Sequence, residues 1–162
     1  MTIRVAQTRD LQHIVDIYNE TIASRMVTAD TEPTTVEQRL SWFDSHHSQR
    51  PLFVYEEGEE ILAWLSFKSF YGRPAYDQTC EISIYIATRA RGKGLGHSLM
   101  TFAQEHAPSI GVTTLLGFIF SHNTPSINLF KKHGFSCWGE LPAVAVMDEK
   151  HYNLTIMGKH LS

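Results

Sequence analysis

The chain has 162 residues, of which 43% are hydrophobic and 19% are charged, a composition typical of one globular domain with a sizeable core. Its net charge of -3 argues against a general nucleic-acid-binding surface. Cys80 and Cys137 form no paired motif, which indicates free thiols in a reducing compartment. Met1–Ala6 lacks the apolar stretch of a signal peptide, and no apolar run is long enough to cross a bilayer. We therefore expect residues 1–162 to form a single cytoplasmic domain with no membrane partner.

The first half of the chain predicts a strand, two helices and a hairpin. Thr2–Ala6 alternates like a strand, and Thr8 or Asp10 is expected to cap the helix that follows. The apolar face of that helix would hold Leu11, Ile14, Val15, Tyr18 and Ile22. A second helix would begin at Thr34 or Thr35 and present Val36, Leu40 and Phe43. Two strands are then expected around a turn at 56–59, namely Pro51–Tyr55 and Ile61–Phe67.

The second half predicts four strands and two helices. The strands are expected at Glu81–Ile86, Thr113–Phe120, Phe135–Leu141 and Tyr152–Gly158. The helices are expected at Leu95–Ala107 and Asn123–His133, the second ended by Gly134. Hairpins mixed with strand-helix-strand units indicate an α+β fold, with a mixed central sheet of about seven strands and about four helices.

A basic, glycine-rich turn joins the strand at 81–86 to the helix that begins near Leu95. The first turn of a helix leaves its N–H groups without intrahelical partners, and the helix dipole adds positive charge there. Glycines let a ligand approach the backbone, and Arg91 and Lys93 add full charges. The turn therefore predicts a phosphate or pyrophosphate site.

Two common phosphate motifs do not fit this turn. No G-x-x-x-x-G-K-[ST] string occurs in the chain, which excludes a P-loop. The glycines at 92, 94 and 96 are spaced one residue too closely for G-x-G-x-x-G, and residues 112–116, where a dinucleotide fold would need a carboxylate, contain none. What remains is Arg91-Gly92-Lys93-Gly94-Leu95-Gly96 between a strand and a helix.

This turn resembles the pyrophosphate loop of the GCN5-related N-acetyltransferase (GNAT) superfamily, [RQ]-x-x-G-x-[GA], to which Arg91, Gly94 and Gly96 correspond. A second stretch resembles that superfamily's N-x-x-[AS]-x-x-[LF]-[YH]-x-x-x-GF motif, beginning at Asn123 and Ser126 and ending at Gly134-Phe135. Both motifs occur in the expected order, and the predicted elements follow the order of the superfamily along nearly the whole chain.

Further short matches are similar to one branch, the phosphinothricin and methionine sulfoximine N-acetyltransferases. They are Tyr18-Asn19, Thr31-Glu32-Pro33, Arg73 with Tyr76-Asp77, Glu81-x-Ser83-x-Tyr85 and Gly139-x-Leu141-Pro142. The branch implies acetyl-CoA as donor, the α-amino group of an amino acid or analogue as acceptor, and a homodimer.

The resemblance also implies which residues hold the coenzyme. The backbone of Ile84, Tyr85 and Ile86 would line it, and Asn123 would bind the pantetheine arm, with Ser126 as the small residue that lets the helix approach. The pyrophosphate would lie on the turn formed by Arg91, Gly92, Lys93, Gly94, Leu95, Gly96 and His97.

Glu81 is the candidate general base, because amine acetylation needs a neutral amine. Strand alternation places Thr79, Glu81, Ser83 and Tyr85 on one face of the sheet. A carboxylate in a central strand is unusual, and partial burial would raise its pKa toward the range useful for catalysis. The resemblance places the base at the same position, where it could act directly or through a water.

The leaving-group acid is where the sequence departs from the family, which has Tyr or His at the position of Phe130. Either no acid is needed, or His122, His133 or Tyr85 serves, and the sequence does not choose between them.

Arg73 is the candidate for binding an acceptor carboxylate or phosphinate, because a guanidinium can donate two parallel hydrogen bonds. Tyr76 would line the same pocket. Ala29 and Tyr71 stand where the branch commonly has Phe and, in some members, Lys, which favours methionine sulfone, methionine sulfoximine or an ordinary amino acid over phosphinothricin.

Two other functions stay open. One is acetylation of a different amine, such as a polyamine, an aminoglycoside or a protein N-terminus. Arg73 argues mildly against the first two acceptors, which are cationic. The other is a non-catalytic acyl-CoA-binding module, which Phe130 favours and Glu81 opposes. The nine histidines form no tight ligand spacing, so we expect no metal.

Overall fold

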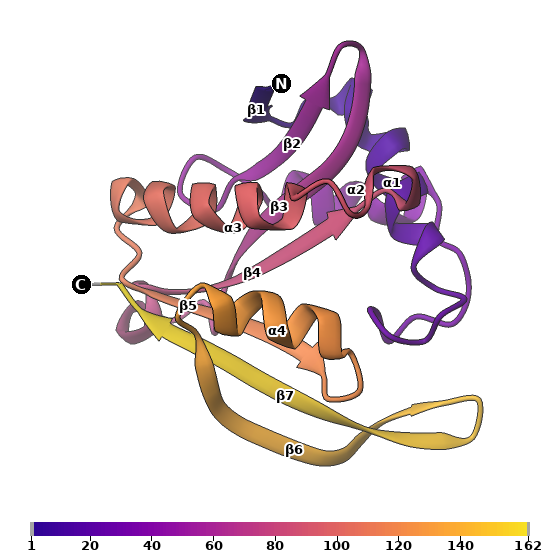
Figure 1. Cartoon of the computed structure of the whole chain (residues 1–162). Helices are drawn as coiled ribbons and strands as arrows, with labels where there is room; N and C mark the ends of the chain where they lie inside the picture. The colour runs from indigo at the N-terminus through magenta and orange to yellow at the C-terminus, as the bar shows by residue number, and fades with distance from the viewer. Residues whose placement is uncertain (1, 162) are drawn as a thin grey trace.

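A computed structural model of the protein describes residues 2–161, in which seven strands form one mixed sheet (Figure 1). The strands lie in the order β1-β2-β3-β4-β5-β7-β6. Their bounds are β1 Thr2–Val5, β2 Leu52–Glu57, β3 Glu60–Ser69, β4 Thr79–Ile86, β5 Thr114–Phe120, β6 Ser136–Met147 and β7 Lys150–His160. The helices are α1 Leu11–Glu20, α2 Val36–Asp44, α3 Leu95–His106 and α4 Thr124–Lys132. The predicted α+β class and element order are confirmed.

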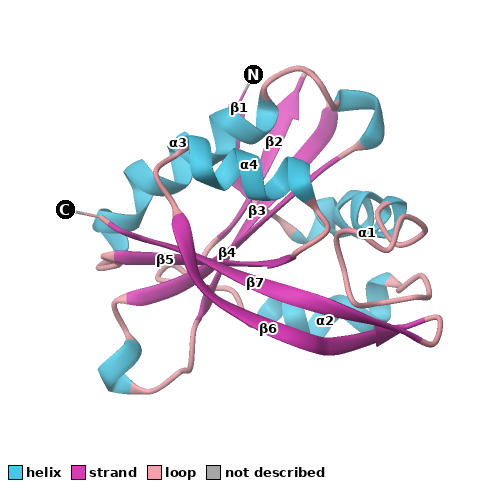
Figure 2. Cartoon of the chain, turned by 60° about the horizontal axis from the view of Figure 1, so that its bottom comes forward, coloured by secondary structure: helices cyan, strands magenta, loops and turns pink. Residues whose placement is uncertain are grey.

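Two helices cover each face of the sheet (Figures 1 and 2). On one face lie α1 and α2, where the indole Nε1 of Trp64 on β3 donates to the carbonyl of Ile14 on α1 over 3.1 Å. On the other lie α3 and α4, where the rings of Phe53 on β2 and Phe102 on α3 pack edge to face with centroids 4.8 Å apart. Alternation along each strand therefore divides the sheet into two faces with separate cores.

The caps of the first two helices match the sequence only in part. Thr35 caps α2, because its hydroxyl accepts from the backbone N–H of Gln38 over 3.2 Å. Leu40 on the same helix is 40% exposed, so its predicted inward position is wrong, and Trp42 packs inward instead. Asp10 stands at the N-cap position of α1, but its carboxylate accepts from Arg4 and from the N–H of Gln7 rather than from the helix.

The last hairpin is longer than the sequence pattern indicates. The sequence predicts strands at Phe135–Leu141 and Tyr152–Gly158, and Pro142 cannot donate to a strand ladder. In the structure β6 is an edge strand, continues past Pro142 through a register shift between Leu141 and Ala145, and pairs with β7 to Met147. An edge strand tolerates proline because one side of it needs no partner.

No helix within residues 2–161 is long and apolar enough to cross a membrane.

Candidate active site

The two central parallel strands part in the middle of the sheet. The ladder between β4 and β5 runs only from the Thr79–Thr114 pair to the Glu81–Leu116 pair. On its other edge β4 stays paired with β3 as far as Ile86. From Ser83 onward β4 therefore has no strand on its β5 side, and backbone N–H and C=O groups on that side remain available to a ligand.

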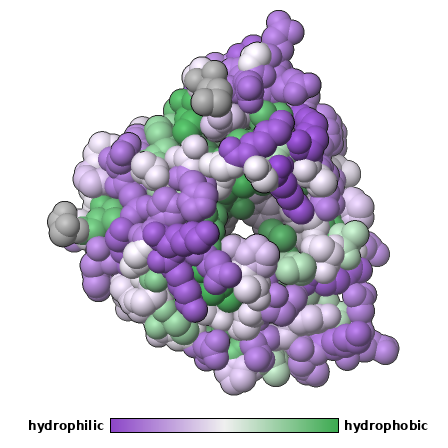
Figure 3. Space-filling model, in the orientation of Figure 1, coloured by the Kyte–Doolittle hydropathy of each residue, from purple (hydrophilic) through white to green (hydrophobic). Residues whose placement is uncertain are grey.

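A cavity of about 460 Å³ fills the opening between the two strands. Figure 3 shows the same region as a hollow near the centre of the face that carries α3 and α4. Its walls come from β4, the end of β5, the start of α4 and the loop after α1. Its lining includes Ile84, Tyr85, Ile86, Arg91, Asn123, Ser126, Leu129 and Phe130. Six of the predicted coenzyme residues are thus brought together in one cavity.

The glycine-rich turn stands at the start of α3. Gly92 and Gly94 have φ of +76° and +79°, a conformation that favours glycine, and Gly94 is the N-cap of α3. The first hydrogen bond of the helix is donated by the N–H of Ser98 to the carbonyl of Gly94 over 3.1 Å. The N–H groups of residues 95–97 therefore have no partner within the helix.

Not every residue of the turn can meet a ligand through its side chain. The side chain of Leu95 is buried in the core. A Cβ at Gly96 would lie 3.1 Å from Cδ2 of Leu129, so this glycine lets α3 approach α4. Arg91, Lys93 and His97 are exposed. Leu95 and Gly96 could therefore contact a phosphate only through their backbone.

Asn123 is the N-cap of α4, and its side-chain oxygen accepts from the N–H of Ser126 over 3.3 Å. It is 8% exposed and lines the cavity. In the described part of the chain its amide nitrogen has no acceptor, which leaves a donor at the cavity wall.

The histidines suggested as acids lie outside this cavity. Nε2 of His122 is 2.8 Å from the carbonyl of Arg25. His133 follows the C-terminal end of α4, where its Nε2 is 3.0 Å from Nδ1 of His97. Tyr85, in contrast, lines the cavity, and burial raises the pKa of its hydroxyl, which keeps it protonated.

Glu81 lines a second cavity of about 250 Å³ on the face that carries α1 and α2. Ser83 and Tyr85 belong to the walls of both cavities, so the two spaces meet at β4. The second cavity also contains Tyr18, Arg39, Trp42, Trp64, Ser66 and Lys68.

The surroundings of Glu81 favour its neutral form. Burial raises the pKa of Glu81, and the charge of Lys68, its partner in the β3–β4 ladder, opposes that rise. His46 lies behind the same wall, with Nδ1 3.0 Å from the carbonyl of Trp42 and Nε2 2.7 Å from the hydroxyl of Ser66. Burial lowers the pKa of His46 to about 4, so the ring is neutral and Ser66 donates to it.

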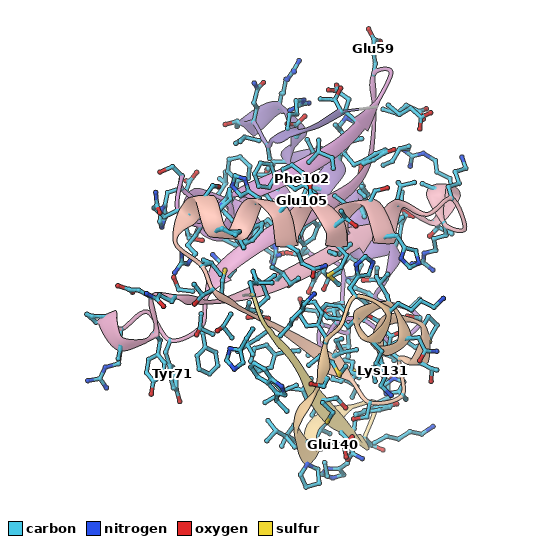
Figure 4. All side chains as sticks on the ribbon, turned by 60° about the vertical axis from the view of Figure 1, so that its left-hand side comes forward. Glu59, Tyr71, Phe102, Glu105, Lys131 and Glu140 are labelled. Atoms are coloured by element: carbon cyan, nitrogen blue, oxygen red, sulfur yellow. The ribbon has the colours of Figure 1, made fainter. Side chains whose placement is uncertain are left out.

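Arg73 and Tyr76 line neither cavity. They lie on the loop between β3 and β4. On this loop the rings of Tyr71 and Tyr76 pack against each other with centroids 5.3 Å apart. Figure 4 shows Tyr71 on a loop that projects beyond the end of the sheet. The loop joins the sheet through Phe70, which stacks on Phe118 of β5 with centroids 6.4 Å apart. This ring lies on the same face of the sheet as Glu81, by alternation from the Glu81–Leu116 pair.

Sequence reasoning missed Arg39, Ser66 and Lys68. The signal for two of them was present, because period-two alternation along β3 places Ser66 and Lys68 on the face of Trp64. In the β3–β4 ladder Ser66 lies opposite Ser83, and Lys68 lies opposite Glu81. This pairing depends on the register of the two strands, which the alternation of residues along one strand does not define. Within residues 2–161 there is no group of three or more His, Cys, Asp or Glu residues that could hold a metal.

Comparison with known proteins places this geometry in a family. The model of the acetyltransferase (GNAT) family matches residues 13–135. The sequence is 55% identical over 163 residues to the Bacillus subtilis (strain 168) protein named "Putative phosphinothricin acetyltransferase YwnH", with 100% of both chains covered. It is 30% identical over 162 residues to an L-methionine sulfoximine/L-methionine sulfone acetyltransferase of Pseudomonas aeruginosa, covering 99% of this chain and 94% of that one.

A solved structure described as "yncA, a putative ACETYLTRANSFERASE from Salmonella typhimurium with its cofactor Acetyl-CoA" has a TM-score of 0.90 to this chain. The two sequences are 28% identical, and the match covers 99% of this chain and 94% of that one. The superfamily and branch predicted from the sequence are confirmed by these relatives. The chain therefore belongs to the acetyltransferase (GNAT) family, whose members are acetyl-CoA-dependent N-acetyltransferases.

Proposed function

We propose that the protein moves the acetyl group of acetyl-CoA to the α-amino group of an amino acid or analogue, such as phosphinothricin, methionine sulfoximine or methionine sulfone. The observation that carries the proposal is the meeting of two cavities at Ser83 and Tyr85. One has room and backbone donors for an acyl-coenzyme, and the other is lined by the half-buried carboxylate of Glu81. The relatives named for these three acceptors support the choice of acceptor.

The coenzyme would lie in the larger cavity. Its pyrophosphate would accept hydrogen bonds from the backbone of Gly92, Gly94, Leu95 and Gly96 at the start of α3, beside the charges of Arg91, Lys93 and His97. Its pantetheine arm would run along Ile84, Tyr85 and Ile86 of β4, opposite Asn123 and Ser126. The thioester would then lie at the junction of the two cavities.

In the reaction we propose, Glu81 removes a proton from the acceptor's ammonium group, directly or through a water. The neutral nitrogen attacks the thioester carbonyl carbon, and a backbone N–H of β4 stabilises the oxyanion. The nitrogen then gives up its second proton to solvent as the C–S bond breaks, which leaves the amide. The thiolate takes up a proton and leaves as coenzyme A. Phe130 has no proton to give, and the place of Tyr85 at the junction favours its hydroxyl over His122 and His133 as the donor.

We further propose that Arg73 and Tyr76 contact the side-chain end of the acceptor, because their loop stacks onto the sheet face that carries Glu81. Residues 1–162 are proposed to act as one domain, in the cytoplasm, as a homodimer. Nucleic acid and membranes are not proposed as partners.

The test is coenzyme A release from acetyl-CoA by Glu81→Gln, with the three analogues, natural amino acids, spermidine and an aminoglycoside as acceptors. A general base contributes roughly 10²- to 10⁴-fold, so the variant should lose about that much turnover while its affinity for acetyl-CoA stays unchanged. Glu105→Gln, an exposed change on α3, is the matched control. Unchanged turnover in Glu81→Gln would show that the base is another group. Release of coenzyme A only with spermidine or the aminoglycoside would refute the acceptor assignment. Binding of acetyl-CoA by the wild type without release of coenzyme A for any acceptor would favour the non-catalytic acyl-CoA-binding module.

A further inference from the structure

Arg39 on α2 is positioned by aromatic rings rather than by a carboxylate. The central carbon of its guanidinium lies 4.1 Å from the ring centroid of Trp42 and 4.7 Å from that of Tyr18. The ion pairs within residues 2–161 join Arg4 to Asp10 and Glu56, and Arg25 to Asp148, so none of them involves Arg39. The rings fix the guanidinium by cation–π contact and leave its N–H donors for another partner.

Lys68 is a second cation in the wall of the same cavity. Its ammonium donates to the hydroxyl of Ser45, and no carboxylate lies within ion-pair distance of it in the described structure. Burial and the charge of Arg39 both lower the pKa of Lys68. The two cations therefore act on the same space, and an anion placed between them would relieve their repulsion.

The cavity is small enough to fix how an amino acid would lie in it. Its volume is about 250 Å³, and Arg39, Lys68 and Glu81 all line it. An α-amino acid carries its ammonium and carboxylate groups on the same carbon atom, so both must bind within one such space. Glu81 suits the ammonium group, and the two cations suit the carboxylate. Arg73, which lies outside this cavity, suits only the side-chain end.

We propose that Arg39 and Lys68 form a subsite that binds the α-carboxylate of the acceptor. The subsite rests on the proposed function and narrows it: the acceptor is an amino acid with a free carboxylate. Amino-acid amides and polyamines have no carboxylate, so they would place no negative charge between the two cations and would leave them unpaired.

The experiment compares kcat/KM for methionine sulfone with that for its carboxamide, in the wild type and in Arg39→Gln, Arg39→Lys and Lys68→Gln. The ratio of kcat/KM for methionine sulfone to kcat/KM for the carboxamide reports only the contribution of the acceptor's carboxylate. An indirect effect on Glu81 would change both values alike and cancel in the ratio. Arg39→Gln should lower the ratio at least about tenfold, mainly through KM, since a charge-assisted hydrogen bond is lost. Arg39→Lys should keep part of the preference. KM for acetyl-CoA should stay unchanged in all three.

Arg9→Gln, which removes an exposed charge before α1, is the matched control and should keep the wild-type ratio. Melting temperatures show which variants are folded. If Arg39→Gln does not fold, Lys68→Gln tests the subsite in its place. A ratio unchanged in both Arg39→Gln and Lys68→Gln would refute the subsite while leaving the proposed function intact. A wild type that acetylates no amino acid would refute the proposed function and the subsite with it.

Discussion

Glu81 lies on the central strand of the sheet, where its half-buried carboxylate is near the ammonium group of Lys68 without forming an ion pair with it. Burial disfavours the charged form, so the folded protein holds a proton on this group more readily than the unfolded chain does. The same property that suits a base for catalysis near neutral pH therefore costs the fold some stability.

The first prediction concerns stability. Because the pKa of Glu81 is raised in the folded protein, its stabilising contribution is complete below the ordinary Glu pKa and is lost as the pH rises through the raised value. Glu81→Gln carries no charge, so it should melt at a higher temperature than the wild type at pH 7. The difference should shrink toward pH 4. Thermal unfolding across this range measures it, and Glu105→Gln should show no such trend. Equal or lower stability of Glu81→Gln at pH 7 would contradict the prediction.

The second prediction concerns the acid limb of kcat/KM. Activity should fall as the pH drops through the pKa of Glu81, at a value above the ordinary value of about 4.3. The positive charge of Lys68 lowers that pKa, so Lys68→Gln should move the limb to higher pH. The position of the limb is the readout, rather than the height of the profile. A limb that stays in place, or moves to lower pH, would show that Glu81 is not the titrating base.

At the scale of elements, Gly117 stands where β5 separates from β4. This residue follows Leu116, the last residue of β5 that pairs with β4. The ring of Phe130 on α4 occupies the place of a side chain there, and a Cβ on Gly117 would lie 2.4 Å from its Cε2. The glycine therefore lets α4 lie close against β5, with Phe130 in the cavity wall.

The third prediction follows from this contact. Gly117→Ala should displace Phe130, destabilise the protein by about 1–3 kcal/mol and raise KM for acetyl-CoA. Chemical denaturation and initial rates measure the two effects. Gly139→Ala is the matched control, because its Cβ would meet Ile156 at an ordinary 3.8 Å. Adding Phe130→Leu to Gly117→Ala should restore part of the stability. A fully stable Gly117→Ala would mean that the contact does not constrain α4.

The elements also show how far the sequence can predict the structure. Local signals identified the order of strands and helices and the glycine turn, and they limited the α2 cap to Thr34 or Thr35, because each depends on neighbouring residues. The continuation of β6 past Pro142 depends on its place at the sheet edge, which is a property of the topology. The cavity around Glu81 depends on side chains from α1, α2, β3 and β4, so Arg39 and Lys68 could not be grouped with it from spacing alone.

At the scale of the whole molecule, the long hairpin of β6 and β7 carries an unusual number of exposed apolar side chains. Val144 and Val146 are 55% and 60% exposed, and Trp138 and Leu141 are also exposed. The strand that carries them is an edge of the sheet with unpaired backbone groups. Such a surface is typical of a protein–protein contact, and the homodimer proposed above would use it.

The fourth prediction tests that association. Light scattering after gel filtration should give about twice the chain mass of 18.4 kDa. Val144→Glu combined with Val146→Glu should give the monomer, because two carboxylates would be buried without partners. Val5→Glu, on the opposite edge strand, is the matched control, since Val5 is 59% exposed. A monomeric wild type, or a dimer lost in Val5→Glu alone, would contradict the role of the hairpin.

The opening between β4 and β5 has a kinetic consequence for the proposed reaction. The acceptor and the coenzyme would reach the junction from opposite faces of the sheet, so neither would block the entrance of the other. Either could bind first, and coenzyme A should inhibit competitively against acetyl-CoA but not against the amino acid. No acetylated enzyme would be needed, and Cys80 is fully buried with burial raising the pKa of its thiol to about 12. Parallel lines in a double-reciprocal plot are therefore not expected, and intersecting lines are.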